Sequence, residues 1–184
     1  MSSPCPEPDG SSPVQQKFDG RPPMCIDSAK QYGAEMVTTK GTLSIALDPI
    51  AAPRTVNNFV FLGRYHYFDG IVFHRIIPGF VLQGGDPTGT GTGGPGYRFD
   101  DELPKPGRYE LGSLAMANSG SNTNGSQFFV ISGPQGMQLP PKYSLFGKVV
   151  KGLDVVATID AIGTGSGKPK ETVTITSVTI SESD

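Results

Sequence analysis

The sequence predicts an all-β-dominated fold in which eight strands form a closed antiparallel β-barrel capped by two α-helices. Short apolar runs recur along the chain, and each is bounded by Gly, Pro or Asn, as expected for strands joined by tight turns. Two other segments carry apolar residues at helical spacing. The 25 glycines and 17 prolines are spread between these runs and do not form one low-complexity tract. Closure would remove exposed strand edges, and a β-sandwich is the alternative.

The first part of the chain, residues 1–33, is predicted to be an irregular arm. It is rich in Pro, Gly, Ser and Asp and has no hydrophobic periodicity, so we do not expect burial to hold it in place. A disulfide between Cys5 and Cys25 would close it into a loop, a constraint that the chain-entropy model values at roughly 3 kcal/mol. Two unrelated thiols are the alternative. Residues 34–182 are assigned to one globular domain.

The globular domain is expected to begin with a hairpin, whose two runs at 35–39 and 42–47 flank a Gly-containing turn. A helix is predicted at 53–63, with a proline in its first turn and a glycine at its end. A second helix at 152–162 precedes a last strand at 172–180. The strands between the two helices are expected at 71–77, 80–83, 113–117, 128–132 and 144–150.

Composition and spacing exclude several classes of protein. With 15 Lys and Arg, 17 Asp and Glu and no block of like charges, we expect no nucleic-acid binding. No apolar run approaches the roughly 20 residues of a membrane helix, so no membrane insertion is expected. His66 and His74 have no Cys or carboxylate at ligand spacing, which argues against a metal site. The stretch Gly91–Gly96 follows no clear strand and is interpreted as a flexible surface loop, not as a nucleotide site.

One charged residue stands in apolar surroundings. Arg75 lies between Phe73 and Ile77 on one face of a predicted strand, where an unpaired guanidinium would be costly. Gln83 is a candidate partner for it. This pattern alone favours an arginine that extends to the barrel rim, and a functional cation is the alternative. His74 should point to the opposite side of the strand and is interpreted as structural.

Two long motifs carry a resemblance to a known family. The first is FHRIIPGFVLQGGD at 73–86, and the second is LAMAN at 114–118 followed by NTNGSQFF at 122–129. In this order and at this separation they resemble the signature segments of the cyclophilin family of peptidyl-prolyl cis-trans isomerases. The match extends over about residues 37 to 180. The resemblance implies an eight-stranded antiparallel barrel with two capping helices and a substrate groove on its outer face.

The resemblance also implies roles for individual residues. The expected catalytic residues are the cation Arg75, its neighbour Gln83, and Phe80. The expected proline pocket is lined by Phe80, Met116 and Phe129. The other expected substrate-binding residues are Ala117 and Asn118, which offer backbone groups, together with Val81, Gln127, Leu139 and Tyr143. No cofactor is expected, and the implied partners of this expected monomer are proline-containing peptides and unfolded protein clients.

These residue types suit rotation about the peptide bond before proline. Twisting that bond localises the lone pair on the nitrogen, and a guanidinium donor aimed there binds the twisted amide better than the planar one. We therefore expect a peptidyl-prolyl cis-trans isomerase that assists protein folding. The alternative is a proline-peptide binding module or chaperone on the same scaffold, which would not need the cation.

The chain departs from the family pattern at two positions. It has no Trp, and Gln138 stands where the family commonly has one, so we expect weak binding of cyclosporin-type macrocycles. Tyr143 stands where many eukaryotic members carry a histidine, and together these features are similar to bacterial members. The arm and its two cysteines suggest a secreted or membrane-tethered protein whose export signal is not in this chain, since residues 1–6 lack signal-peptide character. A cytoplasmic protein is the alternative.

Overall fold

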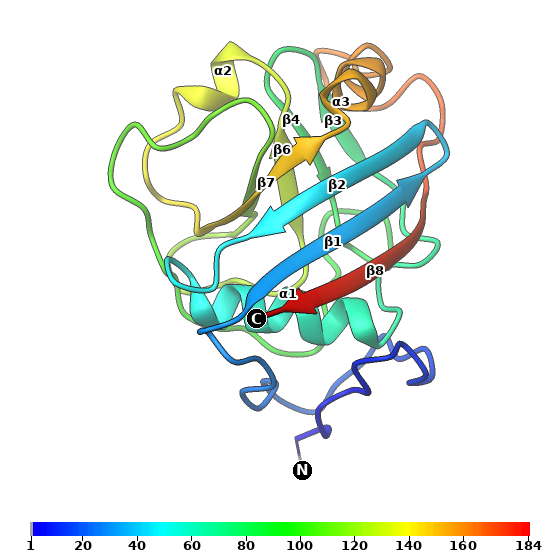
Figure 1. The fold of residues 1–184 in the computed structure, drawn as a ribbon. Helices are drawn as coiled ribbons and strands as arrows, with labels where there is room; N and C mark the ends of the chain where they lie inside the picture. The colour runs from blue at the N-terminus through cyan, green and yellow to red at the C-terminus, as the bar shows by residue number, and fades with distance from the viewer. Residues whose placement is uncertain (1) are drawn as a thin grey trace.

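The computed structural model describes residues 2–184, which form one strongly curved, eight-stranded antiparallel sheet (Figure 1). The strands are β1 (Gln31–Thr38), β2 (Gly41–Leu47), β3 (Arg75–Ile77), β4 (Val81–Gly84), β5 (Ser113–Met116), β6 (Phe128–Ile131), β7 (Leu145–Lys151) and β8 (Ile175–Ser183). Their order across the sheet is β3-β4-β6-β5-β7-β2-β1-β8. The prediction of an eight-stranded antiparallel all-β fold is confirmed.

The predicted closure of the barrel is wrong, because the sheet is an open half-barrel with β3 and β8 as its edges. The chain segments that lead into these strands meet at a single bridge, between Val72 and Thr174. The free edge of β3 is occupied by a loop instead of a strand. The backbone N–H of Ile76 donates to Gly167 O at 2.9 Å, and Ile76 O accepts from Thr164 N at 3.1 Å. Apolar alternation predicts which face of a strand is buried, but not which segment covers its edge.

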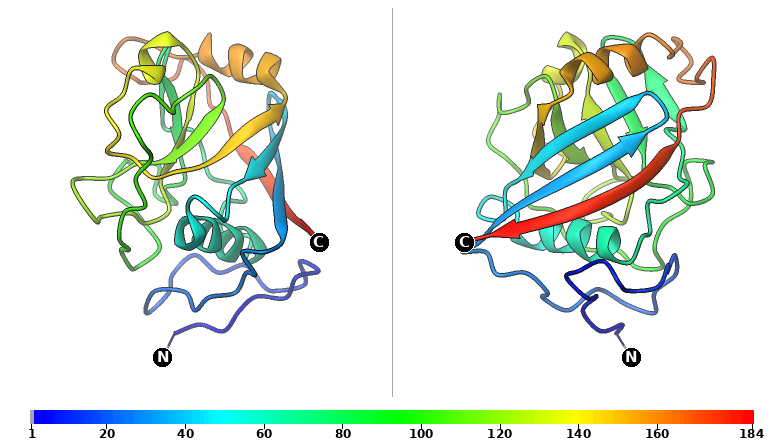
Figure 2. Two further views of the ribbon diagram at one scale, coloured as in Figure 1. Left: turned by 60° about the vertical axis from the view of Figure 1, so that its left-hand side comes forward. Right: turned by 45° about the vertical axis from the view of Figure 1, so that its right-hand side comes forward.

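Three helices accompany the sheet: α1 (Pro53–Arg64), α2 (Pro134–Met137) and α3 (Leu153–Asp160). α1 and α3 lie where the pattern predicts them, at opposite ends of the curved sheet (Figure 2). The single turn of α2 was not expected, because four residues are too few to show a helical period. Among residues 2–184, no helix is long and apolar enough to cross a membrane.

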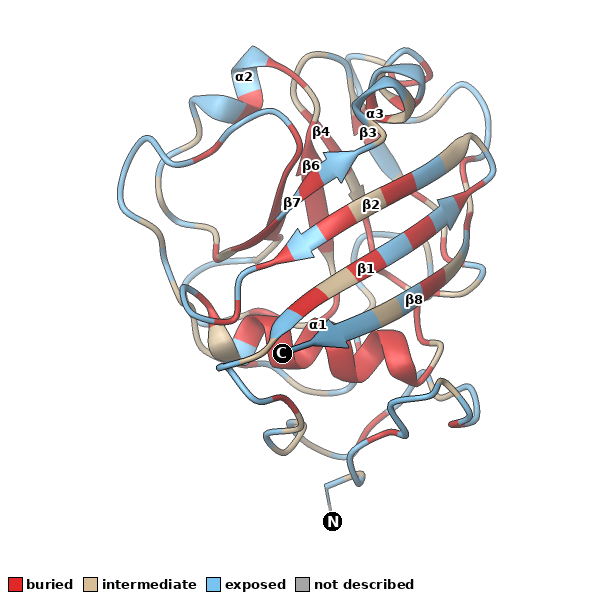
Figure 3. Ribbon diagram, viewed as in Figure 1, coloured by how far each residue is buried: buried red, intermediate tan, exposed pale blue. Residues whose placement is uncertain are grey.

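The main core lies inside the curve of the sheet and against α1, nearly all of which is buried (Figure 3). Aromatic rings form its centre. The Phe59 ring from α1 stacks on that of Phe68 at 5.0 Å, and the rings of Phe128 and Phe146 from β6 and β7 lie 5.8 and 5.4 Å away from it. Such pairs prefer tilted and edge-on geometry, which favours one packing over others. The core therefore holds the sheet rigidly behind its outer face.

The arm packs beneath α1, on the side of the molecule opposite α3 (Figures 1 and 2). Residues 2–30 contain no helix or strand, and Cys5 and Cys25 form a disulfide. The expectation that burial would not hold it is wrong, because Phe18 and Ile26 are buried in the main core. A search for periodicity overlooks two isolated apolar residues in a polar segment, although each buried side chain of this size contributes about 1.5 to 3 kcal/mol.

Candidate active site

The site lies on the outer face of the sheet, where three strands place side chains in one row. Arg75 on β3 is directly opposite Gln83 on β4, and Gln83 is in turn opposite Phe129 on β6. Residues opposite one another in neighbouring strands project from the same face. A second apolar cluster, which is separate from the main core, covers this face and contains Val81, Tyr109, Ala115, Phe129 and Ile131. The sheet therefore carries the cation and the apolar floor on a common surface.

A chain of hydrogen bonds orients the guanidinium of Arg75. Its Nη1 donates to Gln83 Oε1 at 3.1 Å, and Gln83 Nε2 donates to Gln127 Oε1 at 3.1 Å. Gln127 Nε2 donates to the backbone oxygens of Gly91 and Gly93 at 2.9 and 3.0 Å. The side-chain oxygen of Gln83 faces Arg75, and that of Gln127 faces Gln83. These hydrogen bonds therefore fix the orientation of both side-chain amides. The predicted partnership of Arg75 and Gln83 is present in the structure.

The far end of this chain is held by one buried carboxylate, that of Asp86. It accepts hydrogen bonds from the backbone N–H groups of Thr88, Thr90, Gly91 and Gly93, at 2.6 to 3.2 Å, and from the Thr88 hydroxyl at 2.7 Å. Burial acts to raise the pKa of Asp86, but these bonds together hold that pKa below its ordinary value. The expectation of a flexible loop is therefore wrong for its first half, because periodicity does not show hydrogen bonds to a single side chain.

Above the row lies a pocket of about 380 Å³. It brings together nine of the residues expected from the sequence: Arg75, Phe80, Val81, Gln83, Ala117, Asn118, Phe129, Leu139 and Tyr143. The Arg75 guanidinium carbon lies 5.9 Å from the centre of the Phe80 ring, within the range of a cation–π contact. The pocket thus joins a cation and a few polar groups to an apolar surface formed by Phe80, Phe129 and Leu139, which suits a proline ring next to an amide.

Two expected residues lie elsewhere. Gln127 lines a neighbouring hollow and contacts the pocket through Gln83. Met116 does not line the pocket, because it is 1% exposed and belongs to the main core. On a strand, alternate side chains face opposite sides, so Met116 points inward while Ala115 and Ala117 point outward. Alternation along this strand is visible in the sequence and was sufficient to place Met116 on the inner face. The outer-face residue Val81 lines the pocket, whereas Met116 does not.

Sequence reasoning missed several residues of the site. His74, Thr90 and Gly91 also line the pocket. His74 was expected on the opposite side, but it precedes the first residue of β3, where strict alternation no longer applies. It is half-buried, burial lowers its pKa, and its Nδ1 has no hydrogen-bond partner within residues 2–184. It is therefore a neutral wall of the pocket.

The hydroxyl of Tyr109 holds the loop that carries Leu139 and Tyr143. It donates to Tyr143 O at 2.7 Å and accepts from Tyr143 N at 3.2 Å, which ties both backbone groups of that residue to one side chain. The Tyr143 ring in turn meets the Phe129 ring edge-on at 5.4 Å. No local pattern around position 109 indicates this role, since its partner is 34 residues away.

A second hollow of about 660 Å³ adjoins the pocket and shares Gln83, Gly91, Ala117 and Asn118 with it. One wall is formed by residues 93–98, and the other by residues of the 118–127 segment. Because they share these residues, the two hollows form one continuous groove. None of the described residues form a cluster of three or more His, Cys, Asp or Glu able to hold a metal ion.

Comparison with known proteins identifies the family. The sequence profile described as "Cyclophilin type peptidyl-prolyl cis-trans isomerase/CLD" matches residues 34–180. The chain belongs to the cyclophilin family. Enzymes of this family are peptidyl-prolyl cis-trans isomerases and need no cofactor.

Individual cyclophilins show how close the likeness is. Peptidyl-prolyl cis-trans isomerase-like 1 of Gibberella zeae is 45% identical over 153 residues, which cover 80% of this chain and 93% of that protein. Peptidyl-prolyl cis-trans isomerase ppi1 of Schizosaccharomyces pombe is 46% identical over 136 residues, covering 72% and 87%. These relatives are eukaryotic and do not support the expected bacterial character, which depended on only two positions.

Solved cyclophilin structures agree with the fold. The crystal structure of a cyclophilin-type isomerase from Cryptosporidium parvum matches with a TM-score of 0.76 and 35% identity, covering 84% of this chain and 99% of that chain. A second structure of that enzyme, in the presence of the dipeptide Ala-Pro, matches with a TM-score of 0.75 and 36% identity, covering 83% and 99%. Cyclophilins thus bind proline-containing peptides.

Proposed function

We propose that this chain accelerates rotation of X-Pro bonds in peptides and unfolded protein clients, with Arg75 stabilising the twisted amide. The observation that carries this proposal is the oriented guanidinium at the edge of an apolar pocket. Its side-chain hydrogen bond is to the neutral Gln83 and not to a carboxylate. The positive charge is therefore not neutralised within the site, and the remaining N–H groups are available to a substrate.

Rotation requires no bond to be made or broken. The planar amide resists twisting by roughly 18 to 20 kcal/mol, because its nitrogen lone pair is delocalised into the carbonyl. As the bond twists, the lone pair returns to the nitrogen, and a donor from Arg75 binds it more strongly than in either planar isomer. Phe80, Phe129 and Leu139 hold the proline ring while the preceding residue turns. Exclusion of water by these side chains disfavours the more charge-separated planar amide.

An exchange measurement on a peptide with a cis X-Pro bond tests the proposal. We expect the wild-type chain to catalyse exchange between the two isomers without any added cofactor, as observed by NMR line shapes or by a protease-coupled assay. Binding of the peptide without faster exchange would instead favour the proline-peptide binding module.

Turnover should be nearly independent of pH between about pH 6 and 8.5, because the mechanism moves no proton. A guanidinium remains charged throughout this range. Burial lowers the pKa of His74, so this pocket residue gains a proton only below its ordinary pKa of 6.5 and is neutral at higher pH. A bell-shaped profile of kcat/KM against pH would contradict this mechanism.

Cyclosporin-type macrocycles should bind weakly. Gln138 follows α2, is exposed, and adjoins Leu139 of the pocket, so no indole contributes apolar area at this position. The variant Gln138→Trp should lower the Kd about fivefold, since one aromatic contact of this kind contributes about 1 kcal/mol. Fluorescence or calorimetric titration measures the change. An unchanged Kd in the variant would show that another part of the groove limits binding.

We also propose that the chain works outside the cytoplasm. The disulfide between Cys5 and Cys25 supports this location, because such bonds persist in oxidising compartments and are rare in the cytosol. Alkylation of thiols in protein extracted from its source, followed by mass spectrometry, tests it. Free thiols at both cysteines would favour the cytoplasm.

A further inference from the structure

The N-terminal arm lies outside the region that matches the family, yet it contacts one wall of the substrate groove. The backbone N–H of Phe18 donates to Pro95 O at 2.9 Å. The Phe18 ring is buried among the rings of Phe61, Tyr65 and Tyr97. Pro95 and Tyr97 both line the second hollow. A residue of the arm thus packs directly behind that wall.

The contact at Gly96 shows how close this packing is. A Cβ atom added there would lie 2.4 Å from Phe18 O, and Gly96 has a φ of +102°. Only glycine allows the two backbones to approach so closely in this conformation. The wall and the arm are therefore in direct backbone contact, with no room for either to shift independently toward the other.

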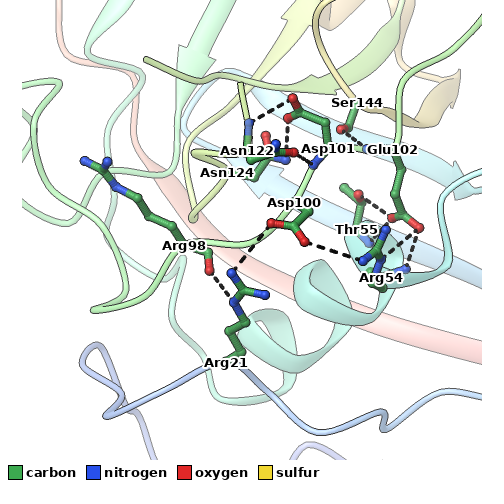
Figure 4. Close-up of polar contacts among 10 residues, drawn as sticks. All are labelled: Arg21, Arg54, Thr55, Arg98, Asp100, Asp101, Glu102, Asn122, Asn124 and Ser144. Carbon is green, nitrogen blue, oxygen red and sulfur yellow. Dashed lines mark hydrogen bonds and ion pairs between the residues drawn. The ribbon is translucent and has the colours of Figure 1, made fainter. Parts of the chain in front are cut away.

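Arg21 makes a second contact to the same wall (Figure 4). Its Nε donates to Arg98 O at 2.6 Å, and its Nη2 lies 3.6 Å from a carboxylate oxygen of Asp100. The other carboxylate oxygen of Asp100 lies 3.9 Å from Arg54 on α1. The arm therefore contacts the wall at two places, through Phe18 at Pro95 and Gly96 and through Arg21 at Arg98, the last residue of the wall.

The segment that follows Arg98 is anchored on all sides (Figure 4). Asp101 exchanges two backbone-to-side-chain hydrogen bonds with Asn122 and accepts a third from Asn124 Nδ2. The Glu102 carboxylate accepts from the backbone N–H of Thr55 at 2.7 Å and so caps α1. The opposite wall of the hollow, which includes Thr123 and Gly125, is therefore braced from the main domain. The wall at 95–98 contacts the main domain through the Tyr97 hydroxyl, which donates to Asn58 on α1, and the arm adds the contacts of Phe18 and Arg21.

We propose that Phe18 and Arg21 are positioning residues for the substrate groove, and that the arm sets the affinity for peptides long enough to reach the second hollow. A short X-Pro peptide occupies only the first pocket, where no arm residue takes part. A longer peptide passes between the two walls, and its affinity depends on how closely residues 95–98 are held. This inference rests on the proposed function, because it places the proline of the substrate in the first pocket.

The test compares Arg21→Ala with Lys17→Ala. Lys17 is an exposed cation of the same arm whose side chain makes no hydrogen bond or ion pair with the wall within residues 2–184, so it controls for the loss of charge. The substrates are a blocked X-Pro dipeptide and two series extended by three residues, one toward the N terminus and one toward the C terminus. For Arg21→Ala we expect KM to rise about threefold to tenfold in one extended series, with kcat unchanged, because one hydrogen bond to a carbonyl is lost.

The control variant Lys17→Ala and the dipeptide substrate show whether the effect of Arg21→Ala is specific to extended peptides. Both variants should turn over the dipeptide as the wild type does. Equal losses on the dipeptide and on the extended peptides, or no loss in either extended series, would overturn the proposal. Affinities of the same peptides are also measured by NMR titration, which does not require turnover. A chain that binds extended peptides in an Arg21-dependent manner but does not catalyse exchange would refute the proposed function and leave this inference standing.

A second variant acts on the arm without touching the wall. The disulfide closes the stretch that carries Phe18 and Arg21, so the double variant Cys5→Ser, Cys25→Ser should loosen both contacts. We expect the same selective rise in KM, and shifts of the backbone amide signals of Gly96 and Arg98 in the NMR spectrum. Unchanged amide signals together with unchanged KM values would show that the wall does not depend on the arm.

Discussion

Replacement of Arg75 by alanine should lower kcat/KM for X-Pro exchange by about 100-fold to 1,000-fold, the usual cost of removing one donor that acts on the transition state. The loss should fall mainly on kcat, because the proline ring is held by the apolar pocket and not by the cation. The free energy of unfolding should change by less than about 1 kcal/mol. Arg75 is exposed, and its side chain makes one hydrogen bond, to Gln83.

Two further variants make this result specific. Arg75→Lys keeps a positive charge but loses the planar fork that Gln83 orients, so its rate should lie between those of the wild type and Arg75→Ala. Arg108→Ala removes an exposed arginine that does not line the groove, and its rate should equal that of the wild type. An undiminished rate in Arg75→Ala would refute the mechanism. A large loss of stability in that variant would show that Arg75 is structural.

The sequence predicts those features of the fold that follow from the local spacing of apolar residues. Alternation and helical spacing place the strands and both long helices, because one buried face is enough to produce each pattern. They do not predict that the sheet stays open. That outcome depends on Gly167 and Thr164, which bind the edge of β3 from about 90 residues further along the chain. Similarly, the arm is held by single residues that no pattern surrounds.

In the candidate site, too, local patterns and motifs predict some features, and others depend on contacts between distant parts of the chain. From the pattern alone Arg75 is a cation in an apolar strand, and the pattern favours an arginine that extends to the rim. The two motifs identify its neighbours, and the structure places most of them in one pocket. The error at Met116 arose because a motif gives membership of a site but not the direction of a side chain. The roles of Tyr109 and Asp86 required the tertiary structure, since each acts through hydrogen bonds that sequence spacing does not reveal.

Replacement of Asp86 by alanine should have the largest effect on stability, with a loss of about 2 to 4 kcal/mol at pH 7. Four backbone N–H groups and one hydroxyl lose their acceptor, and each such hydrogen bond contributes a net of about 0.5 to 1.5 kcal/mol. Gly93 approaches the carboxylate so closely that an added Cβ would lie 2.1 Å from it. The loop from 86 to 93 should therefore lose its shape, and Gln127 its two backbone acceptors.

The consequences for pH and for turnover follow from the same contacts. Because the pKa of Asp86 in the folded chain is below its ordinary value of 3.8, its pH-dependent stabilising contribution is complete above 3.8 and is lost as the pH falls from there through the lower folded-state pKa. The difference between urea unfolding of wild type and of Asp86→Ala should thus be full at pH 7 and should narrow as the pH falls below about 4. Glu35→Ala, which removes an exposed carboxylate on β1, should show no such difference.

At pH 7 and a temperature where Asp86→Ala is folded, the kcat of this variant should also fall, since Gln127 no longer orients Gln83 and Arg75. A stable variant with full turnover would show that the loop holds its shape without this carboxylate.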